Sequence, residues 1–275
     1  MPALPDNIQE TVAIALREDV GHGDLTANLI AAGTETTATV ITREAAILCG
    51  TAWFDEVFRQ LDNSAQISWS VHDGESIHNG QTVCKISGIA QAILTGERTA
   101  LNFLQLLSGT ATATREYVEI LKDCKTQILD TRKTLPGLRS AQKYAVLCGG
   151  GKNHRMGLYD AILIKENHIL AAGSITAAIT TAKKQGVPIE TEVENLSELE
   201  EALAAGTDRI LLDNFDLDGL RQAVAINNGR VILEASGGVD QEKIRSIAET
   251  GVDFISIGAL TKHVRAIDFS MKFHR

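Results

Sequence analysis

The segment DTRKTLPGLRSAQKYAVLCGGGKNHR, residues 130–155, is the most informative part of this chain of 275 residues. Between Asp130 and Glu166, seven Lys or Arg residues stand against three Asp or Glu residues, although the whole protein has a net charge of −9. A local cationic cluster on an acidic protein favours a focused site for an anionic small molecule. The alternative is an exposed basic helix face. It is disfavoured because apolar runs, residues 127–129 and 161–164, flank the segment.

The composition limits the class of protein. A hydrophobic content of 44% is enough for one large domain, or for one large and one small domain. The acidic net charge argues against nucleic acid as the main partner. No apolar run approaches the ~18 residues of a membrane span. The N-terminus lacks the basic and apolar regions of a signal peptide, so we expect a cytoplasmic protein. The widely spaced Cys49, Cys84, Cys124 and Cys148 predict reduced thiols and disfavour a zinc site.

From residue 127 onward, short apolar segments alternate with amphipathic ones. We expect strands at 128–130, 161–165, 189–194, 209–213, 231–235 and 254–257, and helices at 137–148, 175–185, 197–205, 217–226 and 240–250. Ser197 and Glu200 form a predicted capping box, and Gly186, Gly206 and Gly251 stand where helices should end. Lys165, Glu192, Asp213 and Glu234 are 27, 21 and 21 residues apart, a regular β/α repeat. This alternation predicts a parallel sheet covered by helices.

A barrel explains this sheet better than an open dinucleotide-binding fold does, because no G-x-G-x-x-G motif follows the first strand. Nearly every expected strand ends in a polar residue, and barrel active sites lie at the C-terminal ends of the strands. The visible strands are too few for a complete barrel, so we expect an incomplete one.

The first hundred residues predict a small α+β domain. We expect a helix at 6–17, strands at 36–43, 66–72 and 82–87, and turns at Asp73-Gly74 and Asn79-Gly80. Two further helices, 95–107 and 110–122, are expected on either side of Ser108-Gly109.

Three groups of residues at the strand ends carry chemistry. The cationic group is Arg132, Lys133, His154, Arg155 and Lys165, and it suits a ligand with several negative charges. Glu192 and Asp213, on neighbouring strands, suit Mg²⁺ or sugar hydroxyls, although salt bridges to nearby lysines are an alternative. Glycines after the last two strands, in Ser236-Gly237-Gly238 and Ser256–Ala259, suit phosphate but also occur in ordinary turns. Together the groups indicate glycosyl transfer with a diphosphate leaving group.

Several motifs resemble the quinolinate phosphoribosyltransferase family, and they cover essentially the whole chain in order. They are residues 17–26, 95–102, 130–138, 149–155, 163–168, 190–194, 211–214 and 255–260. The resemblance implies an N-terminal α+β sandwich at 1–106, an incomplete (β/α) barrel of about seven strands at 107–264, and a tail at 265–275 that returns to the first domain. It also implies that quinolinate and 5-phosphoribosyl 1-diphosphate give nicotinate mononucleotide, diphosphate and CO₂, with Mg²⁺, in NAD biosynthesis.

The resemblance also assigns residue roles. Arg132, His154, Arg155 and Lys165, with Thr131 beside them, would bind quinolinate. Arg98 would reach in from the other subunit of a homodimer. Lys133 would act at the reacting centre, and Glu192 and Asp213 would act on the ribose and hold the metal. Phosphate would lie at Ser236, Gly237, Gly238, Ile257, Gly258 and Ala259. Lys262-His263 departs from the order in some family members, so no role is assigned to either residue.

Other functions are weaker interpretations. A related phosphoribosyltransferase could act on nicotinate, or a paralogue could serve metal-cofactor transport, but one carboxylate needs fewer cationic groups than two. The turns at 73–77 and 80–83 resemble those of lipoyl carrier domains, yet no lysine stands at a hairpin tip between them. A purely structural barrel would not need charged residues at so many strand ends.

Overall fold

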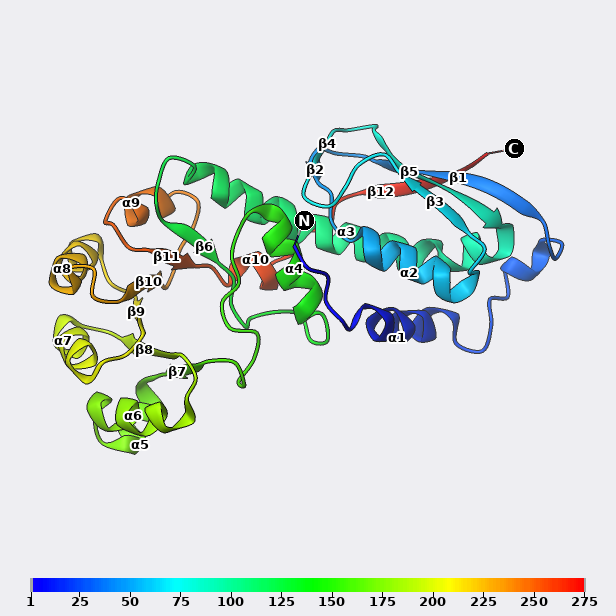
Figure 1. Ribbon diagram of the computed structural model, residues 1–275. Helices are drawn as coiled ribbons and strands as arrows, with labels where there is room; N and C mark the ends of the chain where they lie inside the picture. Colours follow the sequence, from blue (N-terminus) through cyan, green and yellow to red (C-terminus); the bar gives the residue numbers. More distant parts are fainter. Residues whose placement is uncertain (1, 275) are drawn as a thin grey trace. The chain divides into compact units, whose positions relative to one another are not determined.

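The computed structural model describes residues 2–274. Its contacts divide the chain into two compact units (Figure 1). The first contains the chain up to residue 115, residues 134–150 and the chain from residue 259 onward. The second contains residues 116–133 and 151–258.

The first unit contains a four-stranded antiparallel sheet in the order β12-β1-β5-β3. Its strands are β1 (Glu35–Thr42), β3 (Gln66–Trp69), β5 (Thr82–Ile89) and β12 (Phe269–His274). The short strands β2 (Ala46–Ile47) and β4 (Ser76–Ile77) form a separate pair. The three expected strands are found with small changes at their ends. The C-terminal strand β12 pairs with β1 along its length, so the chain's end completes this sheet.

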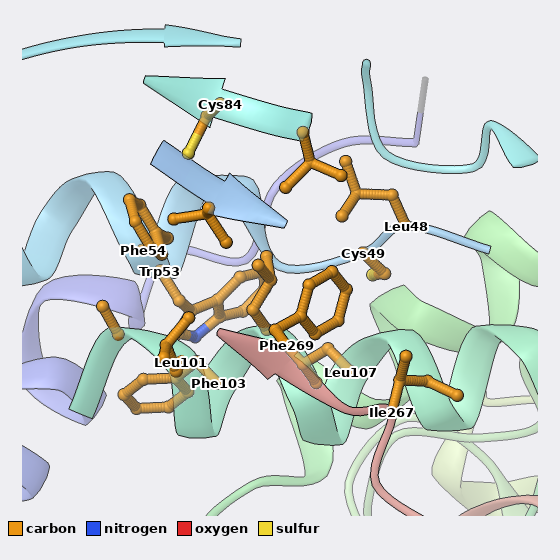
Figure 2. Close-up of a cluster of buried hydrophobic side chains, with 14 of the residues drawn as sticks. Leu48, Cys49, Trp53, Phe54, Cys84, Leu101, Phe103, Leu107, Ile267 and Phe269 are labelled. Carbon is orange, nitrogen blue, oxygen red and sulfur yellow. The ribbon is translucent and has the colours of Figure 1, made fainter. Parts of the chain in front are cut away.

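Helices α1 (Ile8–Val20), α2 (Thr51–Leu61) and the long α3 (Ala90–Ile120) supply the other layer of this unit, together with the 3₁₀ turn η1 (Ala27–Leu29). Figure 2 shows the buried aromatic and aliphatic side chains between helices and sheet, including Trp53, Phe54, Leu107 and Phe269. Burial of such side chains is the main stabilising term of a domain this size.

The prediction of two helices around Ser108-Gly109 is wrong, because α3 continues through both residues. Ser108 Oγ accepts a hydrogen bond from the Cys49 backbone N–H at 3.0 Å. A side chain at position 109 would overlap the Arg265 carbonyl oxygen. Small residues stand here because other segments pack closely on the helix, and not because the helix ends.

Helix α4 (Arg139–Gly149) belongs to the first unit. The domain boundary at residue 106 that the family resemblance implies would place this helix in the barrel domain. The Tyr144 hydroxyl donates to Asp73 Oδ2 at 3.0 Å, and its ring lies 5.4 Å from that of Trp53. The short helix α10 (Ala259–Lys262) contacts α4 in the same unit.

The second unit contains six parallel strands in the order β6-β11-β10-β9-β8-β7. They are β6 (Gln127–Leu129), β7 (Ile162–Ile164), β8 (Ile189–Val193), β9 (Arg209–Asp213), β10 (Ile232–Ser236) and β11 (Phe254–Ser256). An isolated parallel bridge joins Leu129 to Lys152 at the free edge of β6. The described residues therefore form six strands and one bridge where about seven strands were expected. The sheet is that of an incomplete barrel.

The helices of the second unit follow its strands in turn. They are α5 (Glu166–Ala172), α6 (Ile175–Ala182) with the 3₁₀ turn η2 (Lys183–Gln185), α7 (Leu196–Ala205), α8 (Leu217–Asn227) and α9 (Ile244–Ala248). Gly186, Gly206 and Gly251 adopt the expected left-handed conformation, with φ of 68°, 75° and 97°.

The predicted capping box at Ser197 and Glu200 is wrong. Asn195 caps α7 instead, because its side chain accepts the Glu198 N–H at 3.0 Å, and Glu198 in turn accepts the Glu194 N–H at 2.8 Å. The sequence analysis also missed α5, which begins directly after β7.

Candidate active site

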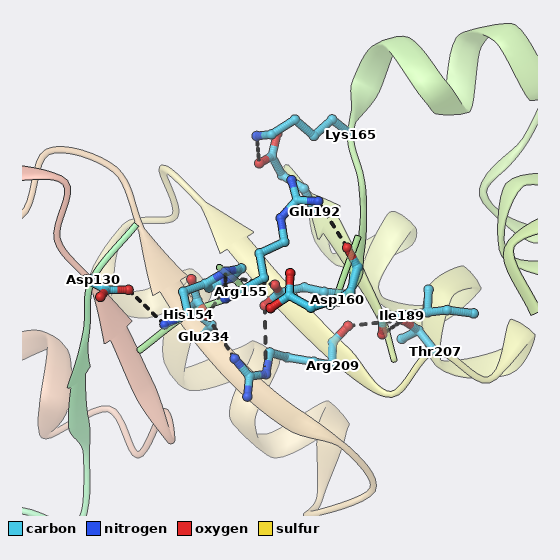
Figure 3. Close-up of polar contacts among 12 residues, drawn as sticks. Asp130, His154, Arg155, Asp160, Lys165, Ile189, Glu192, Thr207, Arg209 and Glu234 are labelled. Atoms are coloured by element: carbon cyan, nitrogen blue, oxygen red, sulfur yellow. Dashed lines mark hydrogen bonds and ion pairs between the residues drawn. The ribbon is translucent and has the colours of Figure 1, made fainter. Parts of the chain in front are cut away.

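Lys165 and Glu192 form an ion pair at the C-terminal ends of β7 and β8 (Figure 3). The His168 side chain anchors the backbone of Lys165, because its Nδ1 accepts the Lys165 backbone N–H at 3.0 Å. Glu192 is mostly buried, whereas the Lys165 side chain is about half exposed. The structure thus brings together one residue of the predicted cationic group and one of the predicted acidic group.

Asp213 ends β9 and is held by its neighbour Asn214, whose Nδ2 donates to Asp213 Oδ2 at 2.7 Å. Asn214 has φ of 57°, an uncommon conformation for a residue other than glycine. Its backbone N–H donates to the Ser236 carbonyl at 3.0 Å, and a side chain at Gly237 would overlap its Oδ1. Asn214 therefore links Asp213 to the predicted phosphate turn. Asn214 belongs to the family motif at residues 211–214, but no role was predicted for it.

Asp130, fully buried at the end of β6, organises the segment that follows α4. Its Oδ1 accepts the His154 backbone N–H at 2.8 Å, and its Oδ2 accepts Asn153 Nδ2 at 2.7 Å. Backbone bonds from Lys152 to Ile128 and from Asp130 to Lys152 continue the attachment. These contacts fix the position of the backbone that carries the His154 and Arg155 side chains.

The His154 imidazole lies against two buried carboxylates. Its Nε2 is 2.6 Å from Glu190 Oε2 and 3.6 Å from Glu234 Oε2, while its Nδ1 accepts the Arg155 backbone N–H at 2.8 Å. Burial lowers the pKa of His154, but the bond to Glu190 and the charge of Glu234 outweigh it, so the net direction is upward. The Nδ1 contact belongs to the neutral ring, so protonation of His154 would break it.

Arg209 completes this buried group, with its Nη1 at 3.4 Å from Glu234 Oε2 and its guanidinium over the Phe254 ring. Burial, and then the charge of Glu190, raise the pKa of Glu234 to about 7. The sequence analysis missed Glu190 and Arg209 because both lie inside strands. Alternation along β8, where Glu190 and Glu192 share a face, was the available signal.

Among residues 2–274, two groups of side chains have the composition of a metal site. His154, Glu190 and Glu234 place ligand atoms within 4.8 Å of one another, and so do Cys49, Asp73 and Cys148. Arg209 already supplies positive charge to the first group. In the second, the Asp73 oxygens accept bonds from Tyr144 and the Thr51 N–H.

Arg132 and Arg155 lie close enough to interact electrostatically. Burial, followed by the charge of Arg132, lowers the pKa of Arg155. Arg155 Nη1 donates to the Ala161 carbonyl at 3.1 Å, and the buried Nε of Arg132 has no hydrogen-bond partner among the described residues. Two mutually repelling guanidinium groups with an unused donor suit an anionic ligand.

Thr131, Lys133 and Gly258 form a third part of the site. The Lys133 backbone N–H donates to Thr131 Oγ1 at 3.0 Å, and a Cβ at Gly258 would stand 2.9 Å from Lys133 Cδ. The Ile257 N–H donates to the Leu129 carbonyl at 2.9 Å, which ties the loop after β11 to β6. Glycine at position 258 thus lets the Lys133 side chain lie against this loop.

The second unit therefore holds most of the predicted site residues. They are Thr131, Arg132, Lys133, His154, Arg155, Lys165, Glu192, Asp213, Ser236, Gly237, Gly238, Ile257 and Gly258. The first unit holds Arg98, exposed on α3, and Ala259, the first residue of α10.

An incomplete parallel α/β barrel with cationic and acidic side chains at its strand ends defines an enzyme class that acts on anionic small molecules. Two family models match the chain: quinolinate phosphoribosyl transferase, N-terminal domain, over residues 24–108, and its C-terminal domain over residues 110–272. The chain belongs to the quinolinate phosphoribosyltransferase family, and it is therefore a pentosyltransferase.

Individual relatives agree. A probable nicotinate-nucleotide pyrophosphorylase (carboxylating) of Bacillus subtilis is 44% identical over 92% of this chain and 89% of the relative. The solved nicotinate-nucleotide pyrophosphorylase of Francisella tularensis is 50% identical, with a TM-score of 0.95, over 99% of this chain and 98% of that one. NadC of Streptococcus pyogenes is 41% identical, with the same TM-score and coverage. Among residues 2–274, no helix is both long and apolar enough to cross a membrane.

The raised pKa of Glu234 gives a testable pH dependence of stability. Folding raises the pKa of Glu234, so its protonated carboxyl adds to the free energy of unfolding. This contribution is complete below the ordinary pKa of a glutamate and is lost as the pH rises through about 7. Glu234→Gln replaces this carboxyl with a group that cannot ionise. We expect the variant's free energy of unfolding, relative to wild type, to rise by on the order of 1–3 kcal/mol from about pH 5 to about pH 8.

Urea unfolding across this pH range measures the difference, and Glu200→Gln, exposed on α7, is the control. Parallel stability curves for wild type and Glu234→Gln would show that the carboxyl does not titrate as its burial implies.

Proposed function

We propose that this protein transfers the phosphoribosyl group of 5-phosphoribosyl 1-diphosphate to quinolinate, with decarboxylation. The products are nicotinate mononucleotide, diphosphate and CO₂, and the step belongs to de novo NAD biosynthesis. The observation that carries the proposal is the pair Arg132 and Arg155, which repel each other and leave a buried donor unused at the barrel's strand ends.

Quinolinate carries two carboxylates and therefore needs several cationic partners. Arg132, Arg155 and Lys165, with His154 beside them, supply these from three segments of one unit. Charge-assisted bonds to carboxylates are shorter and stronger than neutral ones, and guanidinium groups match carboxylate geometry. His154 would have to loosen its contact with Glu190 before its Nε2 could reach a substrate oxygen.

The acidic residues serve the ribose. When the bond from ribose C1 to diphosphate breaks, positive charge develops on the sugar ring. Glu192 and Asp213 would stabilise that charge from neighbouring strands. The pyridine nitrogen of quinolinate then forms the new bond to C1 and becomes a pyridinium.

Decarboxylation follows from that positive charge. The carboxylate beside the ring nitrogen leaves as CO₂, its bonding electrons stay on the ring carbon, and that carbon then takes up a proton. The pyridinium stabilises the electron pair. Lys133, which lies against the loop at Gly258, would act at this reacting centre.

Mg²⁺ is part of the proposal. Glu192 pairs in register with Leu211, so Asp213 lies two residues further along the neighbouring strand, on the same face. Mg²⁺ retains waters and substrate phosphates around it, so one or two partly exposed carboxylates fit it. It would neutralise diphosphate charge when bound. Ser236–Gly238 and Ile257–Ala259 would bind phosphate through backbone N–H groups, apart from that of Ile257, which donates to the Leu129 carbonyl.

The proposal includes a homodimer in which Arg98 acts on the active site of the other subunit. Arg98 is exposed on α3, so it is available to a second copy. A further guanidinium would balance the second carboxylate of quinolinate. A cytoplasmic location also stays a prediction from the sequence.

A nicotinate-specific enzyme is the competing function. The human nicotinic acid phosphoribosyltransferase matches with a TM-score of 0.62 at 15% identity, which shows a shared fold only.

Substrate choice tests the proposed function directly. We expect diphosphate release with quinolinate to be accompanied by an equal amount of CO₂. Charge-assisted bonds are each worth roughly 1.5–3 kcal/mol, so kcat/KM for nicotinate should be about 10–100-fold lower. Coupled assays of both products, with each acid in turn, provide the measurement. Comparable turnover of nicotinate would defeat the assignment.

The acidic pair should act mainly in the transition state. We expect Glu192→Ala and Asp213→Ala each to lower kcat and kcat/KM together, by about 100-fold or more, while the fold survives. Steady-state kinetics and far-UV circular dichroism measure the two effects. Glu194→Ala, exposed beside β8, is the control. Near-normal kcat in folded variants would reduce the two carboxylates to structural ion-pair partners.

Subunit mixing tests the role of Arg98. If Arg98 acts across the interface, Arg98→Ala and Lys133→Ala subunits should each be inactive alone, but their mixed dimers should hold one intact site. We therefore expect activity to recover to about a quarter of wild type after random exchange of equal amounts. Native mass spectrometry verifies the exchange. No recovery in verified mixed dimers would place Arg98 in its own subunit's site, or in none.

A further inference from the structure

Two cysteines that are far apart in the sequence meet in the first unit. Cys49 lies in the loop before α2, among the buried hydrophobic side chains of Figure 2, and Cys148 lies in the last turn of α4. Their sulfur atoms and a carboxylate oxygen of Asp73 all lie within 4.8 Å of one another. The spacing of the cysteines in the sequence disfavoured a zinc site, because it does not reveal that the fold brings these two thiols together.

The Asp73 carboxylate is oriented by two hydrogen-bond donors. The Tyr144 hydroxyl donates to Oδ2 at 3.0 Å, and the Thr51 backbone N–H donates to Oδ1 at 3.2 Å. Each carboxylate oxygen has a second lone pair, so these bonds orient the group and leave it able to bind a metal. Tyr144 and Cys148 are one helical turn apart on α4, so one face of the helix presents both the hydroxyl and a thiol.

The backbone around the two thiols is also held in place. The Cys49 N–H donates to Ser108 Oγ at 3.0 Å. Gly74 has φ of 90°, and a Cβ there would lie 3.3 Å from the Cys148 carbonyl oxygen. Arg115 Nη2 donates to the carbonyl oxygens of Gly74 and Cys148, each at 3.4 Å. Three separate segments of the chain are thus fixed around one point.

The spacing of the three ligand atoms suits zinc. Zinc bonds of ~2.0–2.3 Å place tetrahedral ligands ~3.5–3.8 Å apart. Atoms that already lie within 4.8 Å of one another therefore need to approach by only about 1 Å. The Tyr144 hydroxyl can supply a neutral fourth ligand, because its oxygen keeps two lone pairs while its proton is donated to Asp73.

The group lacks a countercharge. Cys49 is fully buried, Cys148 is 5% exposed and Asp73 is 6% exposed. In the part of the chain that the structure describes, no Lys, Arg or His side chain forms an ion pair with Asp73. A buried charge is costly unless it is paired or binds a metal. A divalent cation would supply the missing positive charge.

The proton balance of metal binding is favourable. Burial, followed by the hydrogen bond with Cys148, raises the pKa of Cys49 well above its usual range, so this thiol keeps its proton until a metal displaces it. Zn²⁺ would form two Zn–S bonds and one Zn–O bond and release two thiol protons to solvent. The group carries one negative charge before binding, from Asp73, and one afterwards, from three anionic ligands and a divalent ion. Zinc therefore adds no net charge to the interior.

We propose that Cys49, Asp73 and Cys148 form a structural zinc site in the first unit. The site ties the loop before α2 and the turn after β3 to the end of α4. It is separate from the Mg²⁺ of the proposed reaction and does not depend on the substrate of the enzyme.

Metal content tests the site. The full chain is expressed with zinc in the medium, purified with a reductant and without chelators, and analysed by inductively coupled plasma mass spectrometry. We expect one zinc ion per chain in wild type and its loss in Cys49→Ser and in Cys148→Ser. Cys84→Ser is the matched control and should keep its zinc, because Cys84 is equally buried but lies on β5, outside the group.

A second measurement needs no variant. Wild type prepared from cobalt-supplemented cells should show a thiolate-to-cobalt charge-transfer band in the near ultraviolet and the visible bands of tetrahedral Co²⁺. Oxygen ligands such as those of Glu192 and Asp213 give no thiolate band. Zinc should abolish these bands when it replaces cobalt. Removal of the metal with a chelator should lower the midpoint of thermal unfolding of wild type and leave that of Cys49→Ser unchanged.

Several results would overturn the proposal. Wild type without bound zinc, zinc kept equally by Cys49→Ser, or cobalt bound without a thiolate band would each show that the thiols are not ligands. Zinc lost in Glu192→Ala instead would place the ion at the strand ends of the second unit. A metal-free wild type with an unchanged unfolding midpoint would remove the structural role.

Discussion

The buried carboxylate of Asp130 is the constraint on which the active site depends. An ionised carboxylate without exposure to water is tolerated only when hydrogen-bond donors surround it. Asp130 takes two of these donors from the His154 backbone and the Asn153 side chain. The segment that carries the cationic residues is therefore tied to the end of β6, and moving it away would break both hydrogen bonds to this buried carboxylate.

The charges of the second unit are segregated along the strands. Glu190 and Glu234 lie buried within strands beside His154 and Arg209, whereas Arg155 and Lys165 stand nearer the ends where substrates would bind (Figure 3). Burial lowers the pKa of His154 but the two buried acids raise it overall, and burial followed by the charge of Arg132 lowers the pKa of Arg155. The acidic interior thus holds one end of the cationic segment, while the other end is left with unsatisfied positive charge for a ligand.

The sequence predicted the features that repeat or cluster. The regular spacing of Lys165, Glu192 and Asp213 located three of the barrel strands, and the family motifs gave the fold class and the family. Contacts between distant segments were not predictable. Ser108-Gly109 resembles a helix break in the sequence. The glycine is needed instead for a close contact with the carbonyl oxygen of Arg265, a residue far along the chain, and the sequence does not reveal that contact. Arg209 and Glu190 could not be recognised as site residues from the sequence, because only the register of β8 and β9 places them side by side on one face of the sheet. The Asn195 cap was missed because Ser197 offered a similar local pattern two residues later.

Calorimetric titration of quinolinate into Asp130→Asn tests the central claim most directly. An asparagine at this position keeps the shape but replaces a charged acceptor by a weaker neutral one. The Kd for quinolinate should therefore rise at least about tenfold, the equivalent of ~1.4 kcal/mol. The cooperative unfolding transition should be retained. Asp218→Asn, at the exposed start of α8, should bind as wild type does. A folded Asp130→Asn protein with the wild-type Kd would contradict the account, because the cationic segment would then hold its position without the buried charge.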